Sequence, residues 1–256
     1  MKTIASIVLA SVLFANCNSN IQAQTQPSTE NRSIETFTKI DNNTSLDIIL
    51  EKGSKESAVI EVTEIDSKKI HTEVKNNTLY ISLDVTRGFS KMKGKVTVTY
   101  VSLNGIENSG SGDIVCKSAI EATEFALNSN GSGDVHFDGD VTVNNFSFHH
   151  RGSGDVAMKN LATDNLTIAM LGSGDFKAEA GSAKNQTITI SGSGNVEVAD
   201  LAGESSNISI KGSGDVSTNV STSLLGNIMG SGNISYKGDP KNKQVDIMGS
   251  GEVVKL

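Results

Sequence analysis

Residues 168–178, Ile-Ala-Met-Leu-Gly-Ser-Gly-Asp-Phe-Lys-Ala, decide the fold of this 256-residue chain. Their central tetrapeptide, Gly-Ser-Gly followed by Asp, Asn or Glu, occurs eight times. The copies begin at Gly110, Gly131, Gly152, Gly172, Gly192, Gly212, Gly230 and Gly249. Successive starts are 21, 21, 20, 20, 20, 18 and 19 residues apart. A repeat of this length is typical of a protein built from one small unit stacked on copies of itself.

Apolar residues recur at fixed distances from each tetrapeptide. If the first glycine is position zero, position +4 is apolar in every repeat: Ile114, Val135, Val156, Phe176, Val196, Val216, Ile234 and Val253. Positions +6, −2 and −4 are mostly apolar as well. All four positions have the same parity, so in a strand their side chains face one side. The columns therefore predict a strand with one buried face before each tetrapeptide and another after it.

The tetrapeptide itself falls into the same register. Both glycines share the parity of the apolar columns, whereas the serine and the acidic residue have the opposite parity and face outward. Loss of side chains on the inner face indicates a bend or a close approach to the core. A single 20-residue unit cannot bury its own apolar face, but coils stacked about 4.8 Å apart can. Residues 109–256 are therefore predicted to form an all-β, right-handed parallel β-solenoid (β-helix) of about seven coils.

Residues 34–108 show β patterning without the glycine repeat. Alternating or β-branched runs occupy residues 46–50, 59–62, 79–83 and 96–100, and turn residues separate them. This β-rich section is expected to cap one end of the solenoid. The charged residues 252–256 are expected to blunt the other end or to form an oligomer contact. Residues 24–33 are polar and predict a short flexible leader.

The first 23 residues have the pattern of a secretory signal peptide. Residues 1–3 are a charged start, residues 4–15 are an apolar run, and Ala23 offers a small residue at the cleavage site. Cys17 supports a second interpretation, because residues 13–17 partly resemble a lipobox, in which the cysteine becomes the lipidated N-terminus. Both interpretations predict an exported protein, located in the periplasm, on the outer membrane surface or outside the cell.

Composition excludes some classes of partner. The formal net charge is −7, which argues against a nucleic-acid or anionic-membrane partner, so a membrane contact is expected only through a lipid anchor. After cleavage at Ala23, Cys116 is the one cysteine left, and no intramolecular disulfide can form. Cys116 lies in the inner +6 column, where a small buried side chain is expected.

These features together resemble a known family. The signal peptide, the β-rich section that ends in residues 96–106 (Val-Thr-Val-Thr-Tyr-Val-Ser-Leu-Asn-Gly-Ile) and the serial Gly-Ser-Gly-Asp repeats are similar to the autotransporter adhesin family with a head GIN domain. The resemblance covers residues 34–256. It implies a secreted or surface β-helical protein of Bacteroidetes-type bacteria and carries over no catalytic residues.

The acidic column has three interpretations. Stacked carboxylates about 4.8 Å apart repel each other by roughly 0.9 kcal/mol even in water, so another interaction must offset the repulsion. The side chains can accept hydrogen bonds from backbone N–H groups at the bend, as in an Asx turn. They can instead bind a row of Ca²⁺ ions or contact a ligand. The calcium interpretation would use Asp113, Asp134, Asp155, Asp175 and Asp215, but Asn195 and Asn233 in the same column favour hydrogen bonding.

Candidate catalytic chemistry is weak. A uniform ladder of equivalent carboxylates lacks the two distinct environments that glycoside cleavage requires. His149 and His150 are adjacent in a strand and point to opposite faces, so with His136 they make a poor metal site. His150 falls in the −2 column and is expected to be a satisfied, partly buried histidine.

The sequence therefore predicts a non-enzymatic, exported binding or scaffold protein, similar to an adhesin, with an unidentified protein or glycan ligand and no cofactor. A homo-oligomer is compatible with this prediction. Two alternatives stay open, namely a carbohydrate-active β-helix enzyme and a protein whose assembly depends on calcium.

Overall fold

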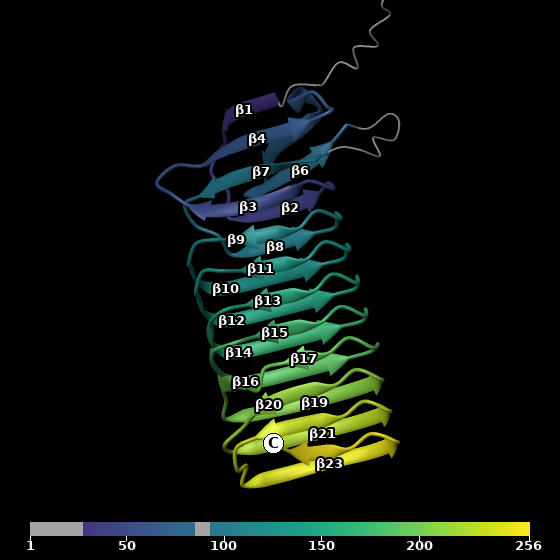
Figure 1. Cartoon of the computed structure of the whole chain (residues 1–256). Coiled ribbons are helices and arrows are strands. Elements are labelled where there is room, and N and C mark those ends of the chain that lie inside the picture. The colour runs from purple at the N-terminus through teal and green to yellow at the C-terminus, as the bar shows by residue number, and fades with distance from the viewer. Residues whose placement is uncertain (1–27, 85–92) are drawn as a thin grey trace, which may run out of the picture.

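The computed structural model describes residues 28–84 and 93–256 (Figure 1). In these residues the secondary structure is 24 β-strands and one short 3-10 helix, η1 (Ser67–Lys69). The strands form two 12-stranded sheets that run the length of the molecule. This confirms the predicted all-β class.

Sheet A runs from the N-terminal end to the C-terminal end of the molecule. Its strands, in spatial order, are β1 (Ser28–Ser33), β4 (Ser57–Thr63), β7 (Lys93–Tyr100), β3 (Asp47–Lys52), β9 (Ile114–Cys116), β11 (Val135–Phe137), β13 (Val156–Met158), β15 (Phe176–Ala178), β17 (Val196–Glu197), β20 (Val216–Asn219), β22 (Ile234–Lys237) and β24 (Val253–Lys255).

Sheet B lies opposite sheet A. From the same end its strands are β5 (Ile70–Lys75), β6 (Thr78–Leu83), β2 (Lys39–Asn43), β8 (Gly105–Asn108), β10 (Ile120–Ser129), β12 (Val141–His150), β14 (Leu161–Met170), β16 (Gly181–Ile190), β19 (Ser205–Gly212), β21 (Ser223–Gly230) and β23 (Asn242–Gly249); β18 (Leu201–Ala202) also pairs with β16.

Each tetrapeptide is the turn that carries the chain from sheet B to sheet A. Neighbouring coils pair in parallel with equivalent residues opposite each other, as in Ile168 with Ile188. The eight tetrapeptide turns join eight strand pairs, from β8–β9 to β23–β24. The predicted parallel solenoid with coils of about 20 residues is therefore confirmed. It has one coil more than expected, because β8, which lies within the predicted N-terminal section 34–108, is the first strand of the first repeat coil.

The predicted apolar columns form the core between the sheets. Every member of the +4 column from Ile114 to Ile234 is at most 1% exposed. Five phenylalanines of the early coils pack together, with ring centroids 5.7 Å apart for Phe125 and Phe146 and 5.3 Å for Phe148 and Phe176. Burial of these side chains is the main source of stability for a chain that has no disulfide in its described residues.

The glycines allow consecutive turns to touch backbone to backbone. A Cβ atom on Gly174 would overlap the carbonyl oxygen of Gly154 in the preceding coil, and would lie 2.9 Å from Nε2 of His150 below it. The same holds along the stack, where Met170 Cε lies 2.9 Å from the Cβ position of Gly194. The serines between the glycines are exposed. The inferred close approach at the inner face is confirmed.

One further coil precedes the repeat and has no glycine turn. Strands β2 and β3 are joined by residues 44–46 (Thr-Ser-Leu), and Gly110 and Gly112 pack on the carbonyl groups of Thr44 and Leu46. Strand β3 pairs in parallel with β9, although the equivalent residues are 66 positions apart. The intervening residues include β4 to β7, so the extra length is an insertion within the first coil. The two sheets are continuous across residue 109.

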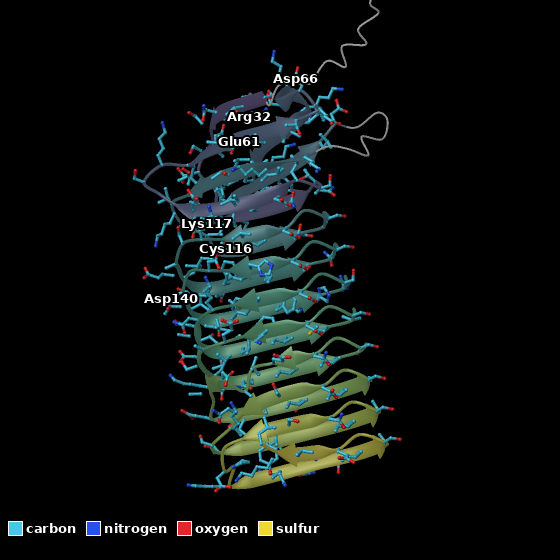
Figure 2. All side chains as sticks on the ribbon, viewed as in Figure 1. Arg32, Glu61, Asp66, Cys116, Lys117 and Asp140 are labelled. Carbon is cyan, nitrogen blue, oxygen red and sulfur yellow. The ribbon has the colours of Figure 1, made fainter. Side chains whose placement is uncertain are left out.

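The insertion closes the N-terminal end of the solenoid. Strands β7 and β6 extend the parallel ladders of β3 and β2, and β4, β5 and β1 then pair antiparallel. Arg32 joins this cap together: its guanidinium donates to both carboxylate oxygens of Glu30, to the carbonyl oxygens of Ile70 and Ser67, and to Thr72 Oγ1 (Figure 2). The expected capping role is thereby observed.

Two expectations concern the N-terminal residues. Within the predicted flexible leader 24–33, Ser28–Ser33 is strand β1 instead, because its backbone pairs with β4 at the edge of sheet A. That part of the prediction was wrong: polar composition does not prevent an edge strand. The predicted signal peptide and Cys17 lie outside the described residues. No helix among the described residues has the length and apolarity needed to cross a membrane.

Candidate binding groove

The acidic column forms a continuous ladder of hydrogen bonds between coils. Oδ1 of Asp134 accepts from the backbone N–H of Asp155 at 2.8 Å, and Oδ1 of Asp155 accepts from that of Asp175 at 2.8 Å. The same bond joins every coil, from Asp47, which accepts from Asp113, to Asn233, which accepts from Glu252. Each side chain therefore accepts a hydrogen bond from the backbone of the next coil. In a local Asx turn it would instead accept one from the backbone of its own turn.

The ladder explains how like charges can stack. Asn195 and Asn233 supply the same acceptor oxygen without a charge, and each also donates its amide group to the carboxylate before it. Among the described residues, no group of three or more Asp, Glu, His or Cys side chains is arranged to hold a metal ion. The ladder residues Asp113, Asp134, Asp155, Asp175 and Asp215 are thus placed for backbone hydrogen bonding.

The histidines do not come together. His136 and His149 lie on the outer surface, on different sheets, whereas His150 is fully buried. Neither ring nitrogen of His150 has a hydrogen-bond partner, so the expected satisfied and partly buried histidine was wrong. Burial lowers the pKa of His150, although nearby backbone groups of Gly152 and Ser129 and the Asp155 charge favour its charged form. Cys116 is a buried free thiol whose pKa is raised by burial.

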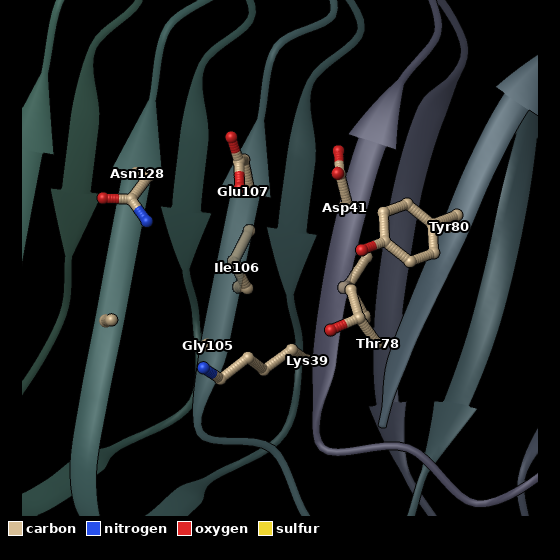
Figure 3. A pocket seen from close by; sticks show the side chains of 10 residues that line it. Lys39, Asp41, Thr78, Tyr80, Gly105, Ile106, Glu107 and Asn128 are labelled. Atoms are coloured by element: carbon tan, nitrogen blue, oxygen red, sulfur yellow. The ribbon is translucent and has the colours of Figure 1, made fainter. Parts of the chain in front are cut away.

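A groove on the outer face of sheet B gathers unpaired polar groups. It has a volume of about 230 Å³ and lies where the cap meets the first coils, across β6, β2, β8 and β10 (Figure 3). One row of its lining runs across the four strands as Tyr80, Asp41, Glu107 and Asn128. The row beside it is Thr78, Lys39, Gly105 and Ala126.

Small residues create the hollow. Gly105 has no side chain, and a Cβ atom there would lie 3.3 Å from Cγ of Lys39 and 3.4 Å from the carbonyl oxygen of Ala126. The stem of Lys39 therefore rests over Gly105, and its ammonium group is free at the groove (Figure 3). The Tyr80 ring stands beside Asp41 and is 38% exposed.

The carboxylates of the groove are in unequal surroundings. Asp41 and Glu107 lie opposite each other on adjacent strands. The pKa of Asp41 is raised, first by burial and then by the charge of Glu107. In the described part of the chain, neither carboxylate nor the Lys39 ammonium has an ion pair or a side-chain hydrogen bond. A hollow that brings together an exposed aromatic ring, several polar groups and a carboxyl with a raised pKa is a candidate binding site.

Two other hollows differ from this groove. A hollow of about 180 Å³ shares Lys39 and Ala126 with it and extends it toward Glu124, Asn145 and Ser147. A wider trough of about 510 Å³ lies on the outer face of sheet A near the C-terminal end. Ladder residues such as Asp215 and Asn233 line that trough, and their oxygens already accept backbone hydrogen bonds.

Sequence reasoning missed the groove. Its residues come from segments up to 89 positions apart, Lys39 to Asn128, and they meet only because β2 pairs with both β6 and β8. No motif marks them. The one local signal was Gly105 at an outward position of a short strand, where a missing side chain indicates a close approach.

The fold and the groove define a class: a two-sheet parallel β-solenoid that presents a small polar groove on its side. The family described as "Putative auto-transporter adhesin, head GIN domain" matches residues 36–240, and the chain belongs to this family. This confirms the resemblance found in the sequence. A comparison with curated proteins gives no match.

Solved structures from Parabacteroides and Bacteroides species share the fold. A putative lipid binding protein from Parabacteroides distasonis is 26% identical, with a TM-score of 0.79, over 90% of this chain and 96% of that one. A putative adhesin from Bacteroides fragilis is 28% identical, with a TM-score of 0.65, over 90% and 97%. A putative adhesin from Parabacteroides merdae, with 23% identity and a TM-score of 0.83 over 90% and 96%, supports the fold alone.

Proposed function

We propose that this protein is an exported, non-enzymatic adhesin that binds a glycan in the groove of sheet B. The observation that carries the proposal is the set of unpaired groups around Tyr80: two carboxylates, an ammonium group and the amide of Asn128. Family membership supports a role in adhesion, and the signal-peptide pattern of residues 1–23 supports export.

The chemistry of the groove suits a sugar. Carboxylates and the Asn128 amide can accept hydrogen bonds from hydroxyl groups, and Lys39 can donate to ring or hydroxyl oxygens. The exposed face of Tyr80 offers an apolar surface for sugar C–H groups. The groove and the adjoining hollow share two lining residues, so together they can take more than one sugar unit.

The test is a glycan array followed by calorimetry with the best oligosaccharide. Tyr80→Ala and Asp41→Asn should each weaken binding about tenfold, which corresponds to about 1.4 kcal/mol. Leu225→Ala is the matched control, because Leu225 lies on the same outer face, is 39% exposed and belongs to a distant coil. Unchanged affinity in both groove variants would refute the site, and preference for phospholipid vesicles or lysine-rich peptides would refute the ligand class.

Export is tested separately by cell fractionation. Processing after Ala23 should give a soluble protein, whereas incorporation of labelled palmitate that is lost in Cys17→Ala would establish a lipid anchor. Retention of the full-length chain in the cytoplasm would contradict export.

A carbohydrate-active enzyme is the second candidate, because Asp41 and Glu107 lie opposite each other and differ in exposure, and glycoside cleavage uses two carboxyl groups in different environments. The expected result for an adhesin is that no polysaccharide in a panel is cleaved. If turnover is seen and Glu107→Gln abolishes it while binding persists, the enzyme assignment replaces the adhesin assignment.

A further inference from the structure

The charges of the groove do not balance. Asp41 and Glu107 lie opposite each other on the paired strands β2 and β8, and both line the groove (Figure 3). Glu124 lines the adjoining hollow. Lys39 lines both hollows and is the one cationic side chain among the described residues that line either of them. Three carboxylates against one ammonium group give the two hollows a formal charge of −2.

The nearby lysines do not neutralise the two carboxylates of the groove. Figure 3 shows the ammonium group of Lys39 on the opposite side of the groove from the carboxylates of Asp41 and Glu107. On strand β5, which pairs with β6 at the edge of the groove, Lys75 lies 2.8 Å from the carboxylate of Glu73 and is committed to that ion pair. Within the described chain, Asp41 and Glu107 therefore carry their charges without an internal partner.

The ladder at the turns shows how the same repulsion is offset elsewhere in the molecule. Asp134 and Asp155 are stacked on adjacent coils, and each accepts a hydrogen bond from the backbone of the next coil. Asp41 and Glu107 are stacked in the same way, but no printed donor of the described residues reaches them. Burial and then the charge of Glu107 raise the pKa of Asp41. A cation from outside the chain would relieve the repulsion between this pair.

An aromatic face stands beside the two carboxylates. Tyr80 is 38% exposed, and its ring lies next to Asp41 (Figure 3). An ammonium group at this point gains cation–π attraction to the ring in addition to hydrogen bonds to the carboxylates. A sugar ring that carries an amine presents this charge together with a rigid face of C–H groups. A lysine side chain carries the same charge on a flexible stem and brings no rigid face to the ring.

We propose that the groove selects a glycan with free amino sugars, and that the ammonium group of one sugar unit lies between Asp41 and Glu107 beside Tyr80. This inference rests on the proposed glycan-binding function of the groove. An N-acetylated sugar has no positive charge to offer, and an acidic sugar is repelled by the negative charge of the two hollows. Thr78 and Asn128, the neutral polar groups at the two ends of the groove, are left to bind hydroxyl groups.

The test is calorimetry with β-linked tetrasaccharides of glucose that differ only at the second carbon of each unit, which bears an amine, an acetamide or a hydroxyl group. At low salt the amine form should bind about tenfold more tightly than the other two, and added salt should reduce this preference. Equal affinity for all three forms, with Tyr80→Ala weakening each of them, would overturn the amine inference and leave glycan binding in the groove standing. If none of the three binds, the inference fails as well, and the glycan array decides on the proposed function.

Two charge variants should have effects of opposite sign. Asp41→Asn should lower the preference for the amine form about tenfold, whereas Lys39→Met should strengthen binding of the amine form about threefold. Damage to the groove cannot strengthen binding, so the second variant distinguishes electrostatics from misfolding. Asp246→Asn is the matched control, because Asp246 is exposed in the same outward row on the distant strand β23, and it should change neither value. Weaker binding of the amine form by Lys39→Met, or equally tight binding of tetralysine, would overturn the proposal.

Discussion

The coils near the N-terminal end and those near the C-terminal end place the same turn sequence over different side chains. In the −2 column, the first four residues are polar: Asn42, Asn108, Ser129 and His150. The next four are apolar: Met170, Ile190, Ile210 and Ile228. All eight are at most 1% exposed. From Gly110 onward the turn above them keeps its glycines in both halves, and the ladder runs through every turn. The turn backbone differs near the C-terminal end, where Gly212, Gly230 and Gly249 have φ angles of +141°, +139° and +146°, whereas the first glycines of the five earlier turns do not have positive φ. This difference does not begin at Met170, so it does not follow the polarity of the residue below.

The buried polar side chains of this column are only partly hydrogen-bonded. Nδ2 of Asn42 donates to Oδ1 of Asn108 at 3.0 Å, and Oδ1 of Asn42 accepts from Thr44. By contrast, Ser129 Oγ and both ring nitrogens of His150 have no partner. Buried polar atoms without partners lower stability, so the two halves should respond differently to substitution at this column and alike at the glycines.

The largest effect is expected at the second glycine of the turn. Gly154→Ala in the polar half and Gly214→Ala in the apolar half should each destabilise the protein by about 3 kcal/mol or more, because the new Cβ overlaps a backbone carbonyl oxygen that cannot move alone. Urea denaturation measures the loss. Ser153→Ala and Ser213→Ala, at exposed positions, should change stability by less than about 0.5 kcal/mol. A tolerated alanine in one half only would show that the residue below does matter.

Asn108→Leu should have the next largest effect. It leaves the buried amide of Asn42 without an acceptor and should cost about 2 kcal/mol of unfolding free energy. Asn42→Leu alone also removes the acceptor of the Thr44 N–H and hydroxyl groups. The double variant Asn42→Leu/Asn108→Leu should therefore lose less stability than the sum of the two single losses, without recovering the parent stability. The comparison of single and double variants in urea is the measurement. Additive losses would mean that the pair does not interact.

His150→Met extends the apolar half by one coil and should stabilise the protein by about 1 kcal/mol at neutral pH. The folded-state pKa of His150 lies below its usual 6.5, so the unfolded chain binds more protons between these two values. Stability of the parent protein should therefore fall as pH drops below about 6.5 and be unaffected by this group above it. Thermal unfolding from pH 7.5 to 5 should show a smaller decrease for the variant. An identical pH dependence would contradict burial of a neutral histidine.

The smallest effect is expected in the ladder. Asp155→Asn keeps the acceptor for the backbone N–H of Asp175, as Asn195 does naturally, and should change stability by less than about 0.5 kcal/mol. Asp155→Ala removes the acceptor and should cost about 1 kcal/mol. Chemical denaturation of the two variants distinguishes the contribution of the acceptor oxygen to stability from that of the charge. If Asn and Ala behave alike, the charge is the important property.

Much of the solenoid could be predicted from sequence, because its unit is local. Strands β3, β4, β6 and β7 were predicted from alternation, and the columns around Ile168 and Phe176 were placed on the correct face. The ladder was anticipated as hydrogen bonding from Asn195 and Asn233, although its direction, from one coil to the next, needed the structure.

The remainder depends on contacts between segments distant in sequence. The turn at residues 44–46 has no glycine, so the repeat could not reveal that β2 and β3 already form a coil. The pairing of Ile48 with Ile114 crosses the inserted cap, and no periodicity records it. The groove is a product of that pairing. His150 was placed in the core by its column, but its missing partners could be seen only in three dimensions.

The coil count also sets a distance. Each step from β8 to β23 advances the chain by about 4.8 Å, and there are seven such steps, so the groove lies roughly 34 Å from the C-terminal end. Gain or loss of one coil would lengthen or shorten this separation by a fixed increment and leave the groove and the last coil unchanged. The number of repeats therefore determines how far the groove stands from the last coil.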